Sequence, residues 1–186
     1  MLPKGLRFSA GLAIGAVLWW YATPAYDTLL AVASTPLVHL DHRYRTASLL
    51  ATGRSIRVTG RSIPPATVPV DQYTASGVLL LALFAMRRDL FHDRGIRAFA
   101  FSLLVVAVMH TLAVVIGMES TYAVRTPDWG DRNYSGTAQD FWQAAEFVYR
   151  IGAMFAVPFA CYWLASVRKE KEETRGGSKA RKKKRR

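Results

Sequence analysis

The chain has very little cysteine and comparatively little acid. Its one cysteine, Cys161, excludes an intrachain disulfide and a zinc site built on several thiolates. Asp and Glu total 13 against 25 Lys and Arg, so the formal net charge is +12. No internal repeat is apparent along the 186 residues, which argues against a transporter built from duplicated halves.

Most of the excess positive charge lies at the C-terminus. Residues 168–186 hold 11 basic and 3 acidic residues, which is +8 of the +12. The composition predicts a disordered cytoplasmic tail that lies against anionic lipid headgroups. The high pI therefore describes a tail, and it does not predict a nucleic-acid-binding fold.

Apolar residues occur in four blocks with charges between them. The blocks are Phe8–Ala22, Tyr73–Met86, Ala98–Met118 and Phe141–Val167. The third has about the ~20 residues needed to cross a hydrocarbon core ~30 Å thick. The sequence therefore predicts an all-α integral membrane protein, with four transmembrane helices in one domain over residues 1–167.

The first block allows more than one interpretation. We favour one long helix that kinks near Pro24 and leaves the membrane around His39, because charges are few before Asp41. The alternative is a short span followed by a helix lying on the outer surface. A cleaved signal peptide fits less well, because Trp19 and Trp20 are typical of an interfacial aromatic belt.

Basic residues near the membrane set the expected orientation. They precede the first block, fill the short loop at 87–97 and follow the fourth block. With four crossings these regions share one side of the membrane, so both termini are expected in the cytoplasm. The expected location is the cell inner membrane. Arginines in the outer loop 41–71 weaken the bias locally.

The outer loop 41–71 has a strand-like pattern. Apolar and polar residues alternate over Arg54–Thr59, and Gly53 and Gly60 flank this run. A period of two is typical of a half-buried strand, so we expect a small extracytoplasmic β-hairpin. The proline-rich segment that follows is expected to be an extended approach to the membrane.

Four polar residues inside or beside the apolar blocks are candidate site residues. Glu146 and Arg150 are four apart, which suits either an ion pair or a polar site near the outer interface. His110 lies mid-span and could act as a base, a proton relay or a hydrogen-bonding residue between helices. Ser76 could be a nucleophile only beside a base, and otherwise its small size permits close helix packing.

A metal site is not predicted. His39, Asp41 and His42 have ligand chemistry, but Arg43 and Arg45 flank them and oppose a bound cation. No other pattern indicates a cofactor.

Several features together form a recognisable pattern. The first block ends in aromatic residues and a proline, namely Trp19, Trp20, Tyr21 and Pro24. The strand-like segment TASLLATGRSIRVTG, an arginine-rich short loop and the last block FWQAAEFVYRIGAMFAVPFACYWLA follow. Over about residues 5–167 this arrangement resembles the small membrane proteins associated with exosortases, which are membrane transpeptidases that process proteins with C-terminal sorting signals.

The resemblance implies an accessory role. Exosortases carry a Cys, an Arg and a His in that order, whereas here Cys161 follows His110. Thr74 and Ala75 stand where a cysteine would be required. The implied function is a non-enzymatic accessory protein of an envelope protein-sorting system, with another membrane protein as its partner. The alternative is a membrane-embedded transpeptidase or protease-like enzyme that uses His110 and Arg150.

Overall fold

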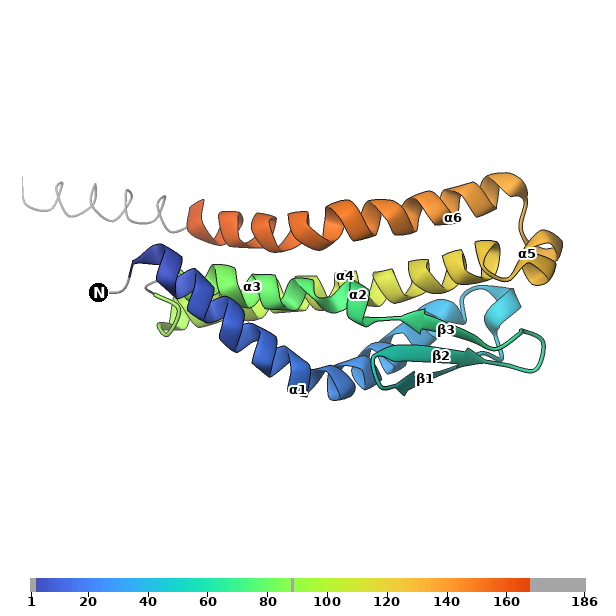
Figure 1. Ribbon diagram of the computed structural model, residues 1–186, viewed down its shortest axis with the longest axis horizontal. Helices are drawn as coiled ribbons and strands as arrows, with labels where there is room; N and C mark the ends of the chain where they lie inside the picture. The colour runs from blue at the N-terminus through green and yellow to red at the C-terminus, as the bar shows by residue number, and fades with distance from the viewer. Residues whose placement is uncertain (1–2, 88, 168–186) are drawn as a thin grey trace, which may run out of the picture.

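The fold is mostly helical, with one small antiparallel sheet. The computed structural model describes residues 3–87 and 89–167, so the predicted tail at 168–186 lies outside the described residues. Figure 1 shows the long helices running along the long axis, with the sheet and α5 at one end. The N-terminus and the connection between α3 and α4 lie at the other end.

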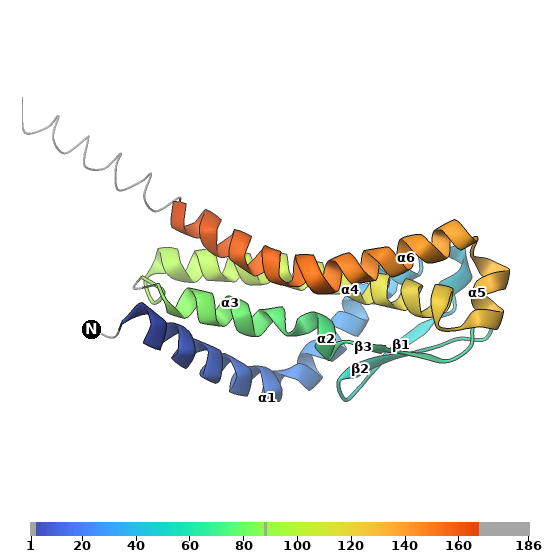
Figure 2. The same cartoon turned by 45° about the horizontal axis from the view of Figure 1, so that its top comes forward.

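The first helix, α1 (Lys4–Val38), contains two prolines, Pro24 and Pro36. At 35 residues it is about 52 Å long. Pro24 has no N–H to donate, so the helix loses a backbone hydrogen bond there, and Figures 1 and 2 show it change direction partway along. The structure therefore agrees with the single long helix that ends before His39.

A sheet follows the 3₁₀ turn η1 (His42–Tyr44), and it has three strands where the sequence predicts two. They are β1 (Ser48–Thr52), β2 (Ser55–Thr59) and β3 (Ala66–Pro69), in the order β1-β2-β3 and antiparallel throughout.

The two strands of the predicted hairpin are present, but the prediction is incomplete because the proline-rich segment supplies a third strand. Its last residue, Pro69, pairs with Ser55. Proline is tolerated there because β3 is an edge strand. Ile56, Val58 and Val68 are fully buried, so this face of the sheet packs on the helices.

A short helical segment then enters the bundle. It consists of α2 (Asp71–Thr74) and α3 (Ser76–Ala85), which follow each other closely. With ten residues α3 is about 15 Å long, half of a hydrocarbon core. Leu80, Leu83 and Phe84 on α3 are buried, and Figure 2 shows α3 between α1 and α4.

The longest apolar helices form the second half of the chain. They are α4 (Asp93–Val124) and the helix that begins as α6 (Gly136–Val148), continues as a π-helical turn η2 (Tyr149–Ala153) and reaches Val167. The short α5 (Pro127–Asn133) joins them.

The number of candidate spans is smaller than the sequence predicts. Among the described residues, two helices are long and apolar enough to cross a membrane, Asp93–Val124 and Gly136–Val167. The second predicted span is too short to cross a membrane, because the helix is interrupted at Ala75 and α3 ends at Ala85. Four transmembrane helices are therefore not found by length and composition.

A glycine allows α5 to fold back on α4. A Cβ placed on Gly130 would lie 2.5 Å from the carbonyl oxygen of Ala123 and 3.0 Å from that of Tyr122. Backbone atoms cannot move aside as a flexible side chain can. Gly130 is therefore required for this close approach.

Gly130→Ala is expected to destabilise the protein by about 1–3 kcal/mol, since the new methyl group separates α5 from α4. Denaturant unfolding of the detergent-solubilised chain, followed by circular dichroism, measures the change. Gly136→Ala is the matched control, because a Cβ there has no neighbour within 4 Å. Equal stability of the two variants would contradict the prediction.

Candidate functional site

The first polar cluster joins three helices through His110 and is here named the His110 cluster (Tyr26, Ser76, His110). The Nε2 atom of His110 lies 2.7 Å from Oγ of Ser76 on α3. The Nδ1 atom lies 2.8 Å from the hydroxyl of Tyr26 on α1. Both ring nitrogens of a fully buried imidazole are therefore hydrogen-bonded within the chain.

Aromatic packing surrounds this cluster. The ring of Trp19 lies 5.1 Å from that of Tyr26 and 6.5 Å from that of His110, measured between centroids. The same indole lies against Gly77, where a Cβ would come within 2.8 Å of it. Gly77 is thus required beside Ser76 to let Trp19 approach.

The second polar cluster is centred on Glu146 of α6 and is here named the Glu146 cluster (Tyr73, Ser120, Arg125, Glu146, Arg150). The Oε1 atom accepts a hydrogen bond of 2.8 Å from the Tyr73 hydroxyl. The Oε2 atom accepts one of 2.6 Å from Oγ of Ser120. The carboxylate is therefore buried with both oxygens satisfied, as a buried charge requires.

Two arginines neutralise this carboxylate. Nη2 of Arg125 lies 2.9 Å from Oε1 and 3.1 Å from Oε2 of Glu146, so it is the closer cation. Nη1 of Arg150 lies 3.8 Å from Oε1, which is the ion pair expected from the spacing of four. Arg125 follows α4, so the cluster joins the end of α4 to α6.

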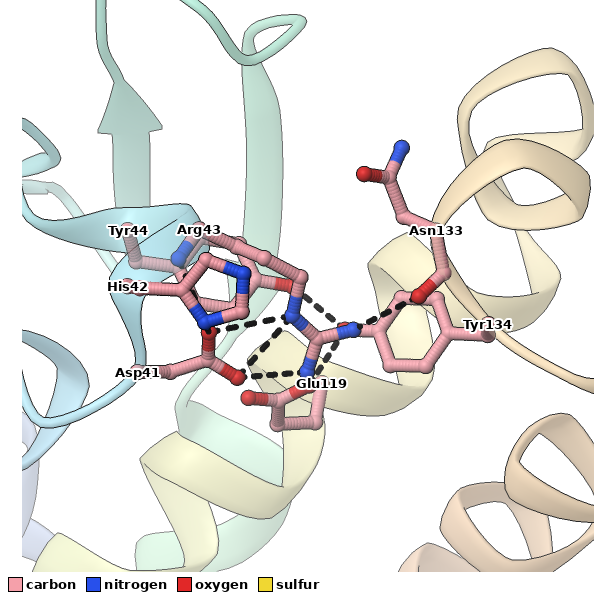
Figure 3. Close-up of polar contacts among 7 residues, drawn as sticks. All are labelled: Asp41, His42, Arg43, Tyr44, Glu119, Asn133 and Tyr134. Carbon is pink, nitrogen blue, oxygen red and sulfur yellow. Dashed lines mark hydrogen bonds and ion pairs between the residues drawn. The ribbon is translucent and has the colours of Figure 1, made fainter.

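The third polar cluster lies where η1 and Tyr134 meet α4 and is here named the Arg43 cluster (Asp41, Arg43, Tyr44, Glu119, Tyr134; Figure 3). The guanidinium of Arg43 donates to both carboxylate oxygens of Asp41 and lies 3.4 Å from Oε2 of Glu119. It also stacks over the ring of Tyr134, 4.0 Å from the centroid.

Two phenols complete this cluster. The Tyr134 hydroxyl donates to Glu119, and the Tyr44 and Tyr134 hydroxyls are hydrogen-bonded to each other. Burial raises the pKa of both phenols above the ordinary value, so both remain protonated donors. Hydrogen bonds from the Arg43 side chain hold the pKa of Asp41 below its usual value. The Arg43 cluster therefore attaches η1 and the α5–α6 connection to α4.

The four sequence-predicted residues fall into two pairs. Ser76 meets His110, and Glu146 meets Arg150, but none of the hydrogen bonds or ion pairs among the described residues joins one pair to the other. In the described part of the chain, no hydrogen bond or ion pair links Arg150 to His110, the two residues that the enzyme alternative uses. The base that Ser76 needs is present, and it is His110.

Several members of these clusters carry no sequence signal of their own. Tyr26, Tyr73 and Tyr134 are tyrosines in apolar or loop surroundings, where an aromatic ring is unremarkable. Arg43 is one of several outer-loop arginines in the sequence, and nothing in its surroundings indicates a pairing with Glu119. Glu119 could have been found, because it is a carboxylate that directly follows the apolar block ending at Met118.

The residues considered for a metal have other partners. The Asp41 carboxylate is bonded to Arg43, and Nε2 of His39 lies 2.8 Å from the carbonyl oxygen of Ala47. Over residues 3–87 and 89–167 there is no group of three or more His, Cys, Asp or Glu that could hold a metal ion.

Comparison of the chain with protein-family models, with curated proteins and with solved structures finds no match.

Removing the Glu146 carboxylate is expected to destabilise the fold by about 3–5 kcal/mol, because Arg125 and two buried hydroxyls lose their acceptor. Glu146→Ala would be compared with Asp140→Ala, an exposed carboxylate on the same helix whose loss should cost about 0.5 kcal/mol or less. Thermal unfolding in detergent gives both values. A Glu146→Ala variant as stable as Asp140→Ala would show that the cluster does not hold α4 to α6.

Proposed function

We propose that the chain is a bacterial inner-membrane accessory protein that binds a membrane partner in an exosortase-like protein-sorting system and is not itself an enzyme. One observation carries this proposal: the candidate catalytic residues are divided between two separate clusters. Both nitrogens of His110 and both oxygens of Glu146 are occupied by side chains of the same molecule. Such saturated groups hold helices together.

The arrangement of charges supports a chain that crosses the membrane with both termini in the cytoplasm. The end of the molecule with the N-terminus and the α3–α4 connection carries Arg7, Arg87, Arg94 and Arg97. The crossings are α4, Gly136–Val167, the part of α1 before Pro24 and, as a short fourth, α3. Because α3 is packed between α1 and α4, protein atoms cover much of it and its short length is tolerable.

The last helix has the surface that a bilayer would cover. Large apolar residues are exposed at every fourth position along it: Phe147, Ile151, Phe155, Phe159 and Trp163. Residues spaced by four are neighbours on the surface of a helix, so these five form a continuous apolar stripe that turns gradually around it. Lipid is the simplest occupant of such a face in a membrane.

The sheet offers a surface to a protein partner outside the membrane. Strand β1 pairs only with β2, so β1 is an edge strand, and Leu50 on it is 63 % exposed. A partner segment could add to such an edge through main-chain hydrogen bonds. The Arg43 cluster makes the region beside it rigid.

A photo-reactive amino acid placed at Leu50 is expected to cross-link in living cells to a transpeptidase of the sorting system. The matched control is the same amino acid at Phe101, which is 66 % exposed on α4 and faces lipid in this proposal. Ser76→Ala is expected to leave the processing of sorted proteins unchanged. Loss of processing in Ser76→Ala, with an intact Leu50 adduct, would contradict a non-enzymatic role.

A second candidate function rests on the contact between Ser76 and His110. If Nδ1 of His110 donates its proton to the oxygen of Tyr26, Nε2 is free to accept the proton of the Ser76 hydroxyl. A nucleophile, a base and a group that orients the base are the parts of serine-dependent acyl transfer. This candidate is a membrane-embedded hydrolase or transpeptidase with Ser76 as nucleophile and His110 as base.

A serine-reactive fluorophosphonate probe tests this candidate directly. An enzyme of this kind is expected to become covalently labelled at Ser76, and the labelling should fall by about 100-fold or more in His110→Ala because the base is lost. Ser102→Ala is the control, since that buried serine donates its hydroxyl proton to the carbonyl oxygen of Ala98. A chain that stays unlabelled would exclude the candidate.

A further inference from the structure

Asp27 is a buried carboxylate that none of the three clusters includes. It lies on α1, three residues after Pro24, and is 0 % exposed. Neither carboxylate oxygen has a hydrogen-bond partner among the described residues. An ionised carboxylate in such a position is costly, because neither water nor a donor compensates its charge.

Charged groups on two other segments act on Asp27. Arg54, in the turn between β1 and β2, and Asp71, at the start of α2, lie close enough for their charges to act on it. On its own helix, Tyr26 is the next residue, and its hydroxyl is hydrogen-bonded to His110 of α4. The negative charge of Asp71 makes a second negative charge at Asp27 still less favourable.

The one nearby cation is engaged elsewhere. The guanidinium of Arg54 lies over the ring of Trp20, 3.5 Å from its centroid. No ion pair joins it to Asp27 in the part of the chain that the structure describes. Its backbone is held, since the carbonyl oxygen of Arg54 accepts hydrogen bonds from the N–H groups of Val70 and Asp71. A change in the position of the Arg54 guanidinium therefore requires a side-chain rotation and no movement of the backbone.

We propose that Asp27 is a proton-binding site whose occupancy decides where the Arg54 side chain lies. With the proton bound, the carboxylic acid is neutral and Arg54 stays on Trp20. When the O–H bond breaks and the proton passes to external water, the new carboxylate attracts Arg54 away from Trp20. The partly exposed indole of Trp20 then loses its contact with the guanidinium of Arg54.

A proton suits this site better than a metal cation. The positive charge of Arg54 repels a metal ion, and a metal ion needs several oxygen ligands whereas a proton needs one. Arg54 and Asp71 are both exposed, so a proton can reach external water on their side of α1. The inference does not depend on the proposed partner, because it rests on Asp27 and its neighbours alone.

Infrared spectroscopy of the full chain in detergent micelles tests the proposal. Between about pH 8 and about pH 5 a C=O stretching band of protonated carboxylic acids should grow, and Asp27→Asn should lack the part of this band that Asp27 contributes. Asp140→Asn, an exposed carboxylate, is the control and should keep the band. The emission of Trp20 is obtained as the fluorescence difference between the chain and its Trp20→Phe variant. This emission should change with the same midpoint, because Arg54 moves away from the indole.

Arg54→Gln provides a second variant that does not disturb the interior. Removing the nearby positive charge favours the neutral acid, so the titration midpoint should rise by about half a pH unit, or about threefold tighter proton binding. A band of unchanged intensity in Asp27→Asn would overturn the proposal. An unchanged titration midpoint in Arg54→Gln would also overturn it. So would loss of the band when sodium ions are added at constant pH, because that result would show that the site binds a metal cation.

Discussion

Polar side chains on α4 have to be satisfied by partners from the other elements, and the rest of the structure depends on this. His110 takes hydroxyl partners from α1 and α3, and Ser120 meets Glu146 of α6. Glu119 meets Arg43 and Tyr134 outside the bundle. An apolar environment makes each unsatisfied polar group expensive, so these contacts determine which helices lie against α4 and in what register.

The glycines and aromatic rings fit this polar arrangement. A Cβ on Gly117 would come within 2.7 Å of the Tyr73 hydroxyl, which is the group that reaches Glu146. Gly77 in the same way admits Trp19 beside Ser76. Close helix packing and polar satisfaction thus depend on the same positions. Asp27 is the exception among the buried carboxylates over residues 3–87 and 89–167, since Glu119 and Glu146 have donors there and Asp27 has none.

Much of the fold could be predicted from local patterns. The long helix through Pro24, the strands around Gly53 and the helices over the third and fourth apolar blocks each depend on residues adjacent in sequence. The pair of Glu146 and Arg150 is likewise set by one helical turn. The third strand could not be predicted, because its segment is rich in proline and forms a strand only when β2 supplies a partner. The short second span was visible in the sequence, because its apolar block Tyr73–Met86 is well below the ~20 residues of a full crossing, and the structure adds the break at Ala75.

The sequence by itself determined which segments are helical, where charge is concentrated and which residues can carry chemistry, because these follow from residue type and spacing. Only the tertiary structure decided which of those residues meet. Ser76 and His110 are 34 residues apart, and Arg43 and Glu119 are 76 apart. Such contacts depend on the packing of whole helices, and the hydrophobic periodicity of one segment does not show which other segment packs against it. The division of the candidate residues into separate clusters is therefore a property of the fold.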